Sequence, residues 1–277
     1  MIIIKSNGGQ LCNRIWSYTH WIAHSIQNDI HIFIIDFQDF SPLFSNLNNL
    51  RKIHFIRSKK LTSFITNFIF SQKLINNLSE YKALKKNRNF LLLNGWEWRN
   101  EVTLVNKNKK QLVNLFVPKK NYIHNCNSIL QKYRNDKTLI GVHIRRKDYK
   151  TSFNGIYYYE NDQYKKFMSE TVQALSVNVN KEFCFLLCSD DDIDPMDFLP
   201  FDCFKIPNAT NIEDLYSLSL CDYIIGPPST FSMWASFYGD VPLKIIDRPD
   251  AKFHVDDFKV ISAVDKFTDG TEFFHSI

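Results

Sequence analysis

The sequence predicts an α/β protein made of two Rossmann-like halves that face each other across a cleft. Short β-branched or apolar runs alternate with segments of helical periodicity at both ends of the 277-residue chain, with a less regular stretch over 40–120 between them. The chain is long enough for two domains, each with its own core. We place the boundary near 117–125, which gives an N-terminal domain over 1–120 and a C-terminal domain over 121–277.

The N-terminal half opens with a strand, a pair of glycines and a helix. The run MIIIK predicts a strand over 1–5, and the glycines that follow permit a tight turn because glycine adopts backbone angles that other residues avoid. Apolar residues then recur every three or four positions over 11–26, which predicts a helix. Further strands are expected within 29–37 and 89–96. This βαβ opening is typical of a parallel sheet covered by helices.

The C-terminal half alternates strands and helices throughout its length. The apolar runs predict four strands, of which we expect the fourth to be the last of the chain, over 138–144, 181–190, 221–226 and 242–247. The helical periodicity predicts helices over 121–134, 164–175, 212–221 and 229–238.

Composition and charge exclude several classes of function. The net charge is +5, and the basic residues are scattered in short groups without the sustained stripe of a nucleic-acid-binding protein. The first residues lack the pattern of a signal peptide, and no stretch is long enough to span a membrane. The six cysteines form no CxxC pair, and no histidines have zinc-ligand spacing. We therefore expect reduced, buried thiols and a cytoplasmic protein.

Polar groups follow three predicted strands at their carboxyl ends, where open α/β sheets bind ligands. The first set is Gly8 and Gly9 with Asn13, at the start of the first helix, where free N–H groups and the positive end of the helix dipole attract anions. A plain strand-to-helix turn explains the same residues. The third set is Ser229 and Thr230, which can cap the helix over 229–238 or bind an anion. The aromatic residues after them (Phe231, Trp234 and Phe237) are expected to face the core.

The second set is the segment HIRRKD over 143–148. Side chains alternate faces along an extended chain, so His143 and Arg145 point one way and Arg146 the other. One arginine can then bind phosphate oxygens bidentately, while the other pairs with a carboxylate and braces the loop. Asp148 is placed to orient an arginine or to reach a ligand hydroxyl. A solvated charged loop is the alternative, which the buried strand directly before the segment disfavours.

A run of aspartates follows the strand over 181–190. Asp190, Asp191 and Asp192 can bind a divalent ion, accept hydrogen bonds from a purine edge, or cap the next helix, and the sequence leaves these three readings open. Neither a GxSxG nor a GxxxxGK[ST] element is present, which argues against the usual serine hydrolases and P-loop enzymes.

In order and spacing, these segments resemble the bacterial α-1,2-fucosyltransferase family. The resemblance rests on GGQLCNR, HIRRKD and STFSMWA, with weaker support from GWEWR and CSDDD, and it spans the chain from residue 2 to about 246. It implies a GT-B fold, GDP-fucose as the donor, inversion at the anomeric carbon, and no required metal or other cofactor.

The resemblance also implies roles for the residues of the three sets. Arg145 would hold the donor diphosphate and stabilise the leaving group, which makes it, with Asp148, a catalytic candidate. His143 would contact the nucleotide, and Asp190 or Asp191 would face the guanine. The remaining donor-binding candidates are Gly8, Gly9, Asn13, Arg146, Ser229, Thr230 and Phe231. The base that accepts the acceptor proton stays open between Asp148, His20 and Glu97.

The expected function is that of an inverting glycosyltransferase of the hexosyltransferase class. It would move fucose from GDP-fucose to a hydroxyl of an oligosaccharide or lipid-linked glycan in the biosynthesis of a bacterial surface polysaccharide such as an O-antigen. The N-terminal domain would serve the acceptor side and the C-terminal domain would bind the donor. A lipid-linked acceptor would bring the protein to the inner face of the cytoplasmic membrane. Two alternatives remain: a different nucleotide-sugar donor, with a metal at Asp190–Asp192, and a non-catalytic relative that binds a nucleotide or glycan.

Overall fold

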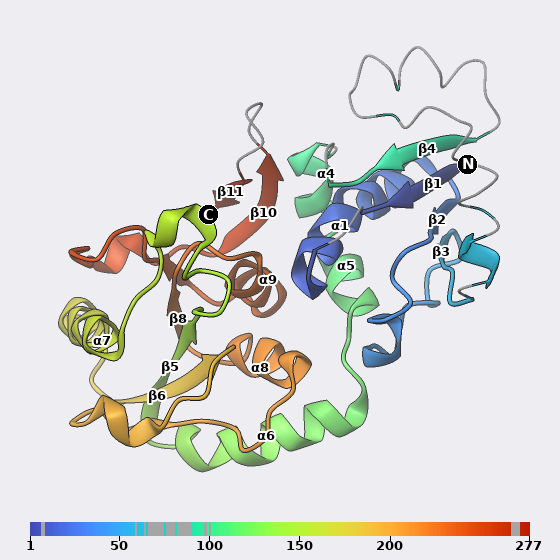
Figure 1. Ribbon diagram of the computed structural model, residues 1–277. Helices are drawn as coiled ribbons and strands as arrows, with labels where there is room; N and C mark the ends of the chain where they lie inside the picture. Colours follow the sequence, from blue (N-terminus) through green and yellow to red (C-terminus); the bar gives the residue numbers. More distant parts are fainter. Residues whose placement is uncertain are drawn as a thin grey trace. The chain divides into compact units, whose positions relative to one another are not determined.

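The computed structural model describes residues 1–6, 9–58, 60–63, 65, 75, 81, 90–96, 99, 101–266 and 272–277. The chain forms two compact units, which are described separately. Unit 1 comprises Met1–Lys119 with Ser262–His275, and unit 2 comprises Lys120–Ile261 with Ser276–Ile277 (Figure 1). The division after Lys119 falls within the boundary region predicted from the sequence. Residues Ser262–His275 belong to unit 1, whereas the sequence predicts a C-terminal domain over the whole of 121–277.

Unit 1 contains a four-stranded parallel sheet in the order β3-β2-β1-β4. Its strands are β1 (Ile2–Lys5), β2 (Ile32–Ile34), β3 (Ile53–Phe55) and β4 (Leu91–Asn94). The strands are short and almost uninterrupted in apolar residues, the pattern of a parallel sheet that is buried on both faces. The βαβ opening predicted from the sequence is confirmed, since β1 pairs in parallel with β2 after one intervening helix.

That helix, α1 (Leu11–Asn28), is the longest described helix of unit 1 and is buried along most of its length. It ends at Asp29, which adopts the left-handed conformation (φ 55°) and donates its N–H to the carbonyl of Ser25. Helices α4 (Val102–Lys107) and α5 (Lys109–Leu115) contact α1. Several phenylalanine rings pack against one another in the same unit, as core packing predicts: Phe37, Phe44, Phe55 and Phe116.

Unit 2 contains a five-stranded parallel sheet in the order β7-β6-β5-β8-β9. The central strand is β5 (Lys137–Ile144), flanked by β6 (Glu182–Ser189) and β8 (Tyr223–Gly226). Strands β7 (Cys203–Phe204) and β9 (Leu243–Ile245) form the edges. The strand order runs outward from β5 in both directions, with β6 and β7 on one side and β8 and β9 on the other. The polar segments after β5, β6 and β8 therefore gather at one edge of the sheet.

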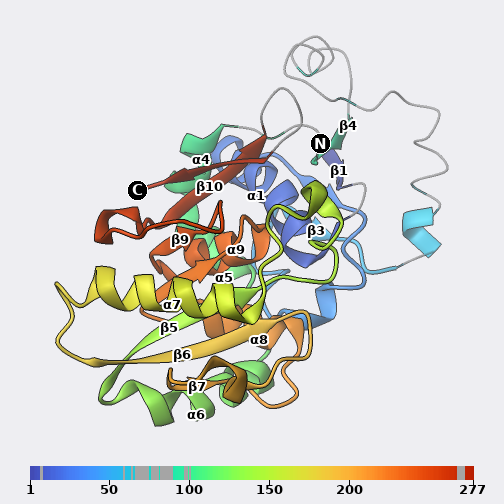
Figure 2. The same ribbon diagram turned by 60° about the vertical axis from the view of Figure 1, so that its left-hand side comes forward.

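Helices cover both faces of this sheet (Figure 2). On one face, Ile140, Val142 and Ile144 of β5 pack in a core cluster with residues of α7 (Asn161–Leu175). Towards the other face lie α6 (Lys120–Arg134) and α8 (Asn211–Leu218), joined by a hydrogen bond of 2.7 Å from Asn125 Nδ2 to Glu213 Oε1. Gly141 permits this packing, since a Cβ there would lie 2.6 Å from Leu218 Cδ2. Helix α9 (Thr230–Gly239) contacts β8 and β9.

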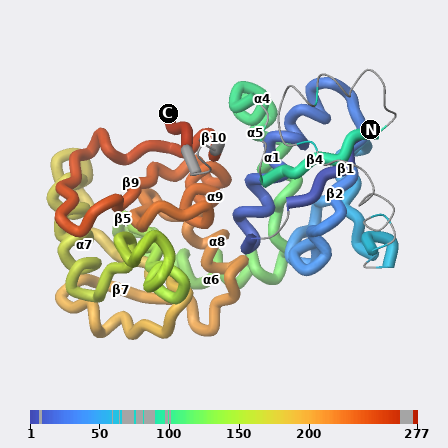
Figure 3. The backbone as a smooth tube through the Cα atoms, turned by 45° about the horizontal axis from the view of Figure 1, so that its top comes forward, coloured from blue at the N-terminus to red at the C-terminus, as the bar shows by residue number. Residues whose placement is uncertain are grey.

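Element boundaries differ from the predicted ones where local capping or pairing decides them. Helix α7 begins three residues earlier than predicted because Glu160 and Gln163 form a capping box. The prediction that the strand at 242–247 is the last was wrong, because β10 (Ile261–Lys266) and β11 (Glu272–Ser276) follow and pair with each other. Figure 3 shows β10 in the red, C-terminal part of the backbone trace. The β-branched and aromatic residues of β10 and β11 are typical of strands.

Two expectations about the whole chain concern cysteines and membrane spans. Five of the six cysteines are buried, as predicted for thiols in apolar runs. Among the helices in the described ranges, none has both the length and the apolar character needed to cross a membrane.

Candidate functional site

The predicted site residues of unit 2 gather around the carboxyl end of β5. In register, His143 and Ile144 pair with Cys188 and Ser189 of β6, and β8 ends alongside at Gly226. The approach of β8 is close, since a Cβ at Gly226 would lie 2.9 Å from His143 Cβ and 3.0 Å from His143 O. Only glycine allows this spacing, which places the segment after β8 beside the segment after β5.

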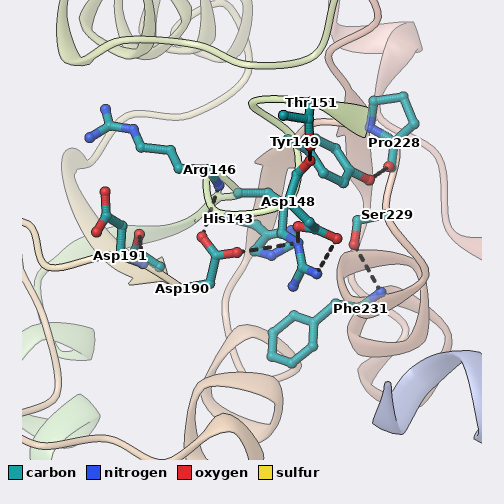
Figure 4. A network of polar contacts seen from close by, with 12 residues as sticks. His143, Arg146, Asp148, Tyr149, Thr151, Asp190, Asp191, Pro228, Ser229 and Phe231 are labelled. Atoms are coloured by element: carbon teal, nitrogen blue, oxygen red, sulfur yellow. Dashed lines mark hydrogen bonds and ion pairs between the residues drawn. The ribbon is translucent and has the colours of Figure 1, made fainter. Parts of the chain in front are cut away.

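Arg145 is held by the carboxylates of Asp148 and Asp190, which come from two segments and are labelled in Figure 4. Its Nε and Nη2 donate to Asp148 Oδ1 and Oδ2 at 2.8 and 2.9 Å, and its Nε lies 3.3 Å from Asp190 Oδ2. The Tyr149 ring lies 5.7 Å from Arg145 Cζ. Burial lowers the pKa of Arg145, but the hydrogen bonds and charges of the carboxylates outweigh burial and raise it. With 21% of its side chain exposed, Arg145 is a fixed positive charge at the surface of the site.

Asp148 positions this arginine. Burial raises the pKa of Asp148, but the hydrogen bonds and charge of Arg145 outweigh it, so the pKa lies below its ordinary value. A carboxylate that is ionised well below neutral pH is a weak general base at pH 7. Its two oxygens are both used by one guanidinium, so the geometry supports the orienting role foreseen for Asp148.

Arg146 braces the loop instead of facing the same side as Arg145. It is buried, donates through Nε to Tyr159 O at 3.2 Å and through Nη2 to Asn161 Oδ1. Its backbone N donates to Asp190 Oδ1 at 2.8 Å. In Figure 4 the side chain extends away from Phe231 and Ser229. The two arginine side chains therefore point to different sides, as the strand alternation predicts. The carboxylate partners that were expected for the bracing arginine are found on Arg145 instead, while a carbonyl and an amide hold the side chain of Arg146.

The aspartates after β6 have different partners. Asp190 uses both oxygens on Arg145 and on the backbone of Arg146. Asp191 is exposed and accepts a hydrogen bond of 3.0 Å from the backbone N of Asp192, whose carboxylate pairs with Lys205 at 3.3 Å. Within the part of the chain that the structure describes, no three His, Cys, Asp or Glu side chains gather as metal ligands would. Asp191 and Asp192 both present their carboxylates to solvent, and Asp191 is the one next to Asp190.

The amino end of α9 forms the third side of the site. Ser229 caps the helix, with its Oγ accepting from the backbone N of Phe231 at 3.3 Å, and Tyr149 Oη donates to the carbonyl of Pro228. Trp234 and Phe237 are buried as predicted. Phe231 is only half-buried and its ring lies 5.1 Å from that of His143, so the expectation that it faces the core was wrong. Because Phe231 is in the first turn of α9, it meets the end of β5 instead.

His143 brings a buried, neutral imidazole into the site. It is 3% exposed, and its Nδ1 has no hydrogen-bond partner among the residues that the structure describes. Burial, and secondly the charge of Arg145, lower the pKa of His143 to about 3. A buried polar atom without a hydrogen-bond partner is unusual in a folded protein. A polar group of a bound ligand would supply the partner that His143 Nδ1 lacks.

The predicted residues of unit 1 form a tight turn before α1. Gly9 has φ +84°, and a Cβ there would lie 2.7 Å from Asn13 Cβ. Arg14 closes the turn by donating through Nε to Gly9 O at 3.1 Å and through Nη1 to the carbonyl of Asp36. Gly8 lies outside the described residues. The glycine turn is therefore required by its own local packing, with Asn13 half-buried in the first turn of α1.

The two other candidate bases are not equivalent to Asp148. His20 is buried in unit 1, with its Nε2 2.7 Å from the carbonyl oxygen of Val264. A main-chain contact of this kind indicates a structural histidine. Glu97 lies outside the described residues.

Sequence reasoning missed the residues that hold the two arginines in place. Tyr149, Tyr159 and Asn161 contact Arg145 or Arg146. The position of Tyr149, four residues after Arg145, was a usable signal, because residues three and four apart meet in a turn of helical conformation. Tyr159 and Asn161 carried no such signal, since the loop that returns them to Arg146 has no periodic pattern.

Comparison with known proteins identifies the family. The model of Glycosyl transferase family 11 matches residues 45–262, whereas a search of curated proteins gave no match. Fucosyltransferase NodZ from Bradyrhizobium is similar in structure, with 16% identity, a TM-score of 0.60 and coverage of 89% of this chain and 96% of that chain. An Arabidopsis thaliana FUT1 variant in complex with GDP has 12% identity, a TM-score of 0.60 and coverage of 90% and 71%. POFUT1 in complex with GDP-fucose has 11% identity, a TM-score of 0.57 and coverage of 87% and 94%.

These structural similarities show the fold, an α/β fold of GT-B type, as the sequence predicted. The family match covers more than half of the chain and includes β5 to β9 with the residues around Arg145. The protein is thus a glycosyltransferase, and the chain belongs to Glycosyl transferase family 11.

Proposed function

We propose that this glycosyltransferase moves fucose from GDP-fucose to a hydroxyl of a glycan acceptor. The transfer inverts the anomeric carbon, forms an α-1,2 linkage, needs no metal, and serves the biosynthesis of a bacterial surface polysaccharide. The observation that carries the proposal is the arginine fixed by two carboxylates, Arg145, at the carboxyl end of the central strand. Family membership supports the reaction class, and the similar structures that hold GDP or GDP-fucose support the donor.

Arg145 has the properties that stabilisation of a leaving group requires. When the bond between the sugar and the diphosphate breaks, negative charge grows on the departing GDP and positive charge on the sugar ring. A positive group that is already in place stabilises the transition state without reorganisation. Asp148 and Asp190 hold Nε and Nη2 of the guanidinium, so its Nη1 end is the part that a phosphate oxygen would meet.

Two neighbouring groups complement Arg145. The amino end of α9, capped by Ser229, directs N–H groups and the positive end of the helix dipole to the same side of unit 2. The buried His143 offers an Nδ1 atom that has no partner within the described chain, and the half-buried Phe231 lies against its ring. In the proposed reaction these groups bind the nucleotide, and Thr230 contributes at the start of the helix.

The proposal that no metal is required rests on the partners of the aspartates. Asp190 is committed to the two arginines, so an ion shared with its neighbours would have to displace these contacts, while Asp192 pairs with Lys205 only at the exposed surface. Asp191 keeps an exposed carboxylate that suits the amino and imino groups of guanine.

A thermal-shift panel tests the donor. We expect GDP and GDP-fucose to raise the melting temperature, because ligands that bind only the folded state stabilise it by mass action, and we expect EDTA to change nothing. GDP-mannose, UDP and UDP-glucose are tested separately as alternative ligands. Stabilisation by UDP, or only in the presence of a divalent ion, would contradict both the donor and the mechanism.

Turnover of an Arg145→Ala variant tests the role of the arginine. We expect GDP release from GDP-fucose to fall by about 10²–10³-fold, the effect of removing one preorganised charge-stabilising group. The matched control is Arg248→Ala, since Arg248 is an exposed arginine of unit 2 that pairs only with Asp250 at 3.7 Å among the described residues. Wild-type turnover of Arg145→Ala would refute the mechanism.

A further inference from the structure

The loop that follows Arg145 carries an aromatic patch made of the rings of Tyr149, Phe153 and Tyr157. Tyr149 is buried, with 7% of the residue exposed, and Tyr157 is half-buried, so Phe153 is the ring that the patch presents to solvent. Phe153 is 60% exposed, and its ring centre lies 6.0 Å from that of Tyr149 and 5.5 Å from that of Tyr157, both in edge-to-face arrangement. Tyr149 and Tyr157 lie 6.4 Å apart. An exposed ring that rests on two further rings beside charged groups offers a face on which a ligand can stack.

The loop holds Phe153 outward in an unfavourable backbone conformation. Phe153 and Asn154 have φ values of +54° and +56°, in the left-handed region that bulky side chains rarely adopt. The loop is nevertheless closed by hydrogen bonds, from Ser152 N to Asp148 O at 2.8 Å and from Ile156 N to Phe153 O at 3.3 Å. Conformations of this kind persist where the surroundings fix them, and they concentrate at functional sites.

The aromatic patch is continuous with the groups around Arg145. The centre of the Tyr149 ring lies 5.7 Å from Arg145 Cζ and 6.0 Å from the centre of the Phe153 ring, and Tyr149 Oη donates to the carbonyl of Pro228. Tyr149 is thereby fixed to both polypeptide segments that form the site in unit 2. In an inverting transfer the acceptor hydroxyl attacks the fucose on the face opposite the diphosphate at Arg145, so the acceptor needs contacts beyond the reacting centre, and a single ring, Tyr149, separates Phe153 from Arg145.

We propose that the aromatic patch is a subsite for the glycan acceptor, in which the apolar face of a pyranose ring stacks on Phe153. This inference rests on the proposed function and adds a recognition element to it. A pyranose carries C–H groups on one face and hydroxyls around its rim, and the negative face of an aromatic ring attracts such C–H groups. The Phe153 ring remains 60% exposed despite its edge-to-face contacts with Tyr149 and Tyr157, and the Tyr157 hydroxyl suits the rim of the sugar.

A lipid surface is the other occupant that this chemistry admits. Ile156 is 57% exposed beside Phe153, and Lys147 and Lys150 of the same loop are exposed, which together suit an anionic bilayer. The direct contact of the patch with Arg145 favours the sugar, because a bilayer needs no such connection to the reacting groups.

Three variants separate these occupants. Phe153→Asn removes the ring while supplying a residue that tolerates the left-handed conformation, so the loop keeps its backbone. Phe153→Tyr keeps the ring. Ile156→Ala, the matched control, removes the neighbouring exposed apolar side chain that has no aromatic face. Each variant is measured for stabilisation by GDP, for retention on a glycan array in the presence of GDP, and for sedimentation with phosphatidylcholine–phosphatidylglycerol vesicles.

We expect the wild type, Phe153→Tyr and Ile156→Ala to be retained by the same glycans, and Phe153→Asn to lose about tenfold or more of that retention, as for a truncated aromatic anchor. GDP should stabilise all four proteins equally. If GDP stabilises them but array retention is absent or independent of Phe153, the subsite is refuted while the proposed function stands. Loss of vesicle binding in Phe153→Asn and Ile156→Ala with unchanged glycan retention assigns the patch to a bilayer and overturns the proposal. Absence of stabilisation by GDP refutes the proposed donor itself.

Discussion

Replacement of Asp148 by asparagine distinguishes a positioning residue from a general base. In the folded protein both oxygens of Asp148 accept from Arg145, at 2.8 and 2.9 Å. Asp148→Asn keeps the shape and one acceptor oxygen but removes the charge and one of the two hydrogen bonds. Arg145 retains its contact of 3.3 Å with Asp190. The variant therefore loosens the guanidinium without releasing it.

The size of the effect follows from the geometry. A hydrogen bond to a charged group contributes about 1.5–3 kcal/mol. The Asp148 side chain is 52% exposed, and solvent screening reduces this contribution to about 1–2 kcal/mol. If the transition state loses this whole stabilisation, turnover decreases by about 5–30-fold. Removal of a general base costs about 10²–10⁴-fold instead.

The assay is release of GDP from GDP-fucose, with kcat and KM measured between pH 5 and 9. Asp190→Asn provides the comparison, since Asp190 holds the same guanidinium and also accepts from the backbone N of Arg146. We expect Asp148→Asn to lower kcat by about 5–30-fold with the same pH profile as the wild type. A loss near 10³-fold together with disappearance of the acidic limb would show that Asp148 is the base and would refute the positioning argument.

Three further predictions concern stability, each measured by urea unfolding. Gly226→Ala places a Cβ 2.9 Å from His143 Cβ and should destabilise the protein by about 1–3 kcal/mol; an unchanged unfolding midpoint would contradict the close approach of β8 to β5. Burial is the main cause that lowers the pKa of His143 to about 3. The imidazole is therefore protonated at a higher pH in the unfolded state than in the folded state, and wild-type stability falls as the pH drops from about 6.5 towards 3. His143→Gln should remove about 3 kcal/mol of that loss between pH 7 and pH 4, and an identical pH slope in both proteins would refute the buried neutral imidazole. Burial raises the pKa of Asp214 to about 7, so stability falls as pH rises from about 3.8 to 7. Asp214→Asn should therefore stabilise the protein by about 1–3 kcal/mol at pH 8 and not at pH 4, and an equal gain at both values would exclude this origin.

The alternation of strands and helices was readable from the sequence because local periodicity determines it. The apolar runs that became β1, β5, β6 and β8, and the periodic segments that became α1 and α6, lie where the pattern predicts them. The strands β10 and β11 were missed, although their residues are β-branched and aromatic. They pair with each other and not with either parallel sheet, so the β/α alternation gave no reason to expect them.

The sequence by itself determined which residues are available at the carboxyl ends of the strands of unit 2, because a parallel sheet brings these ends to one edge whatever the loops do. It also determined that Arg145 and Arg146 separate, because side chains alternate along an extended chain. Only the tertiary structure decided their partners. Asp190 reaches Arg145 through the register of β5 with β6, and Asn161 reaches Arg146 through a loop without periodic pattern. Such contacts depend on distances between segments far apart in the chain, on which local sequence preferences have no influence.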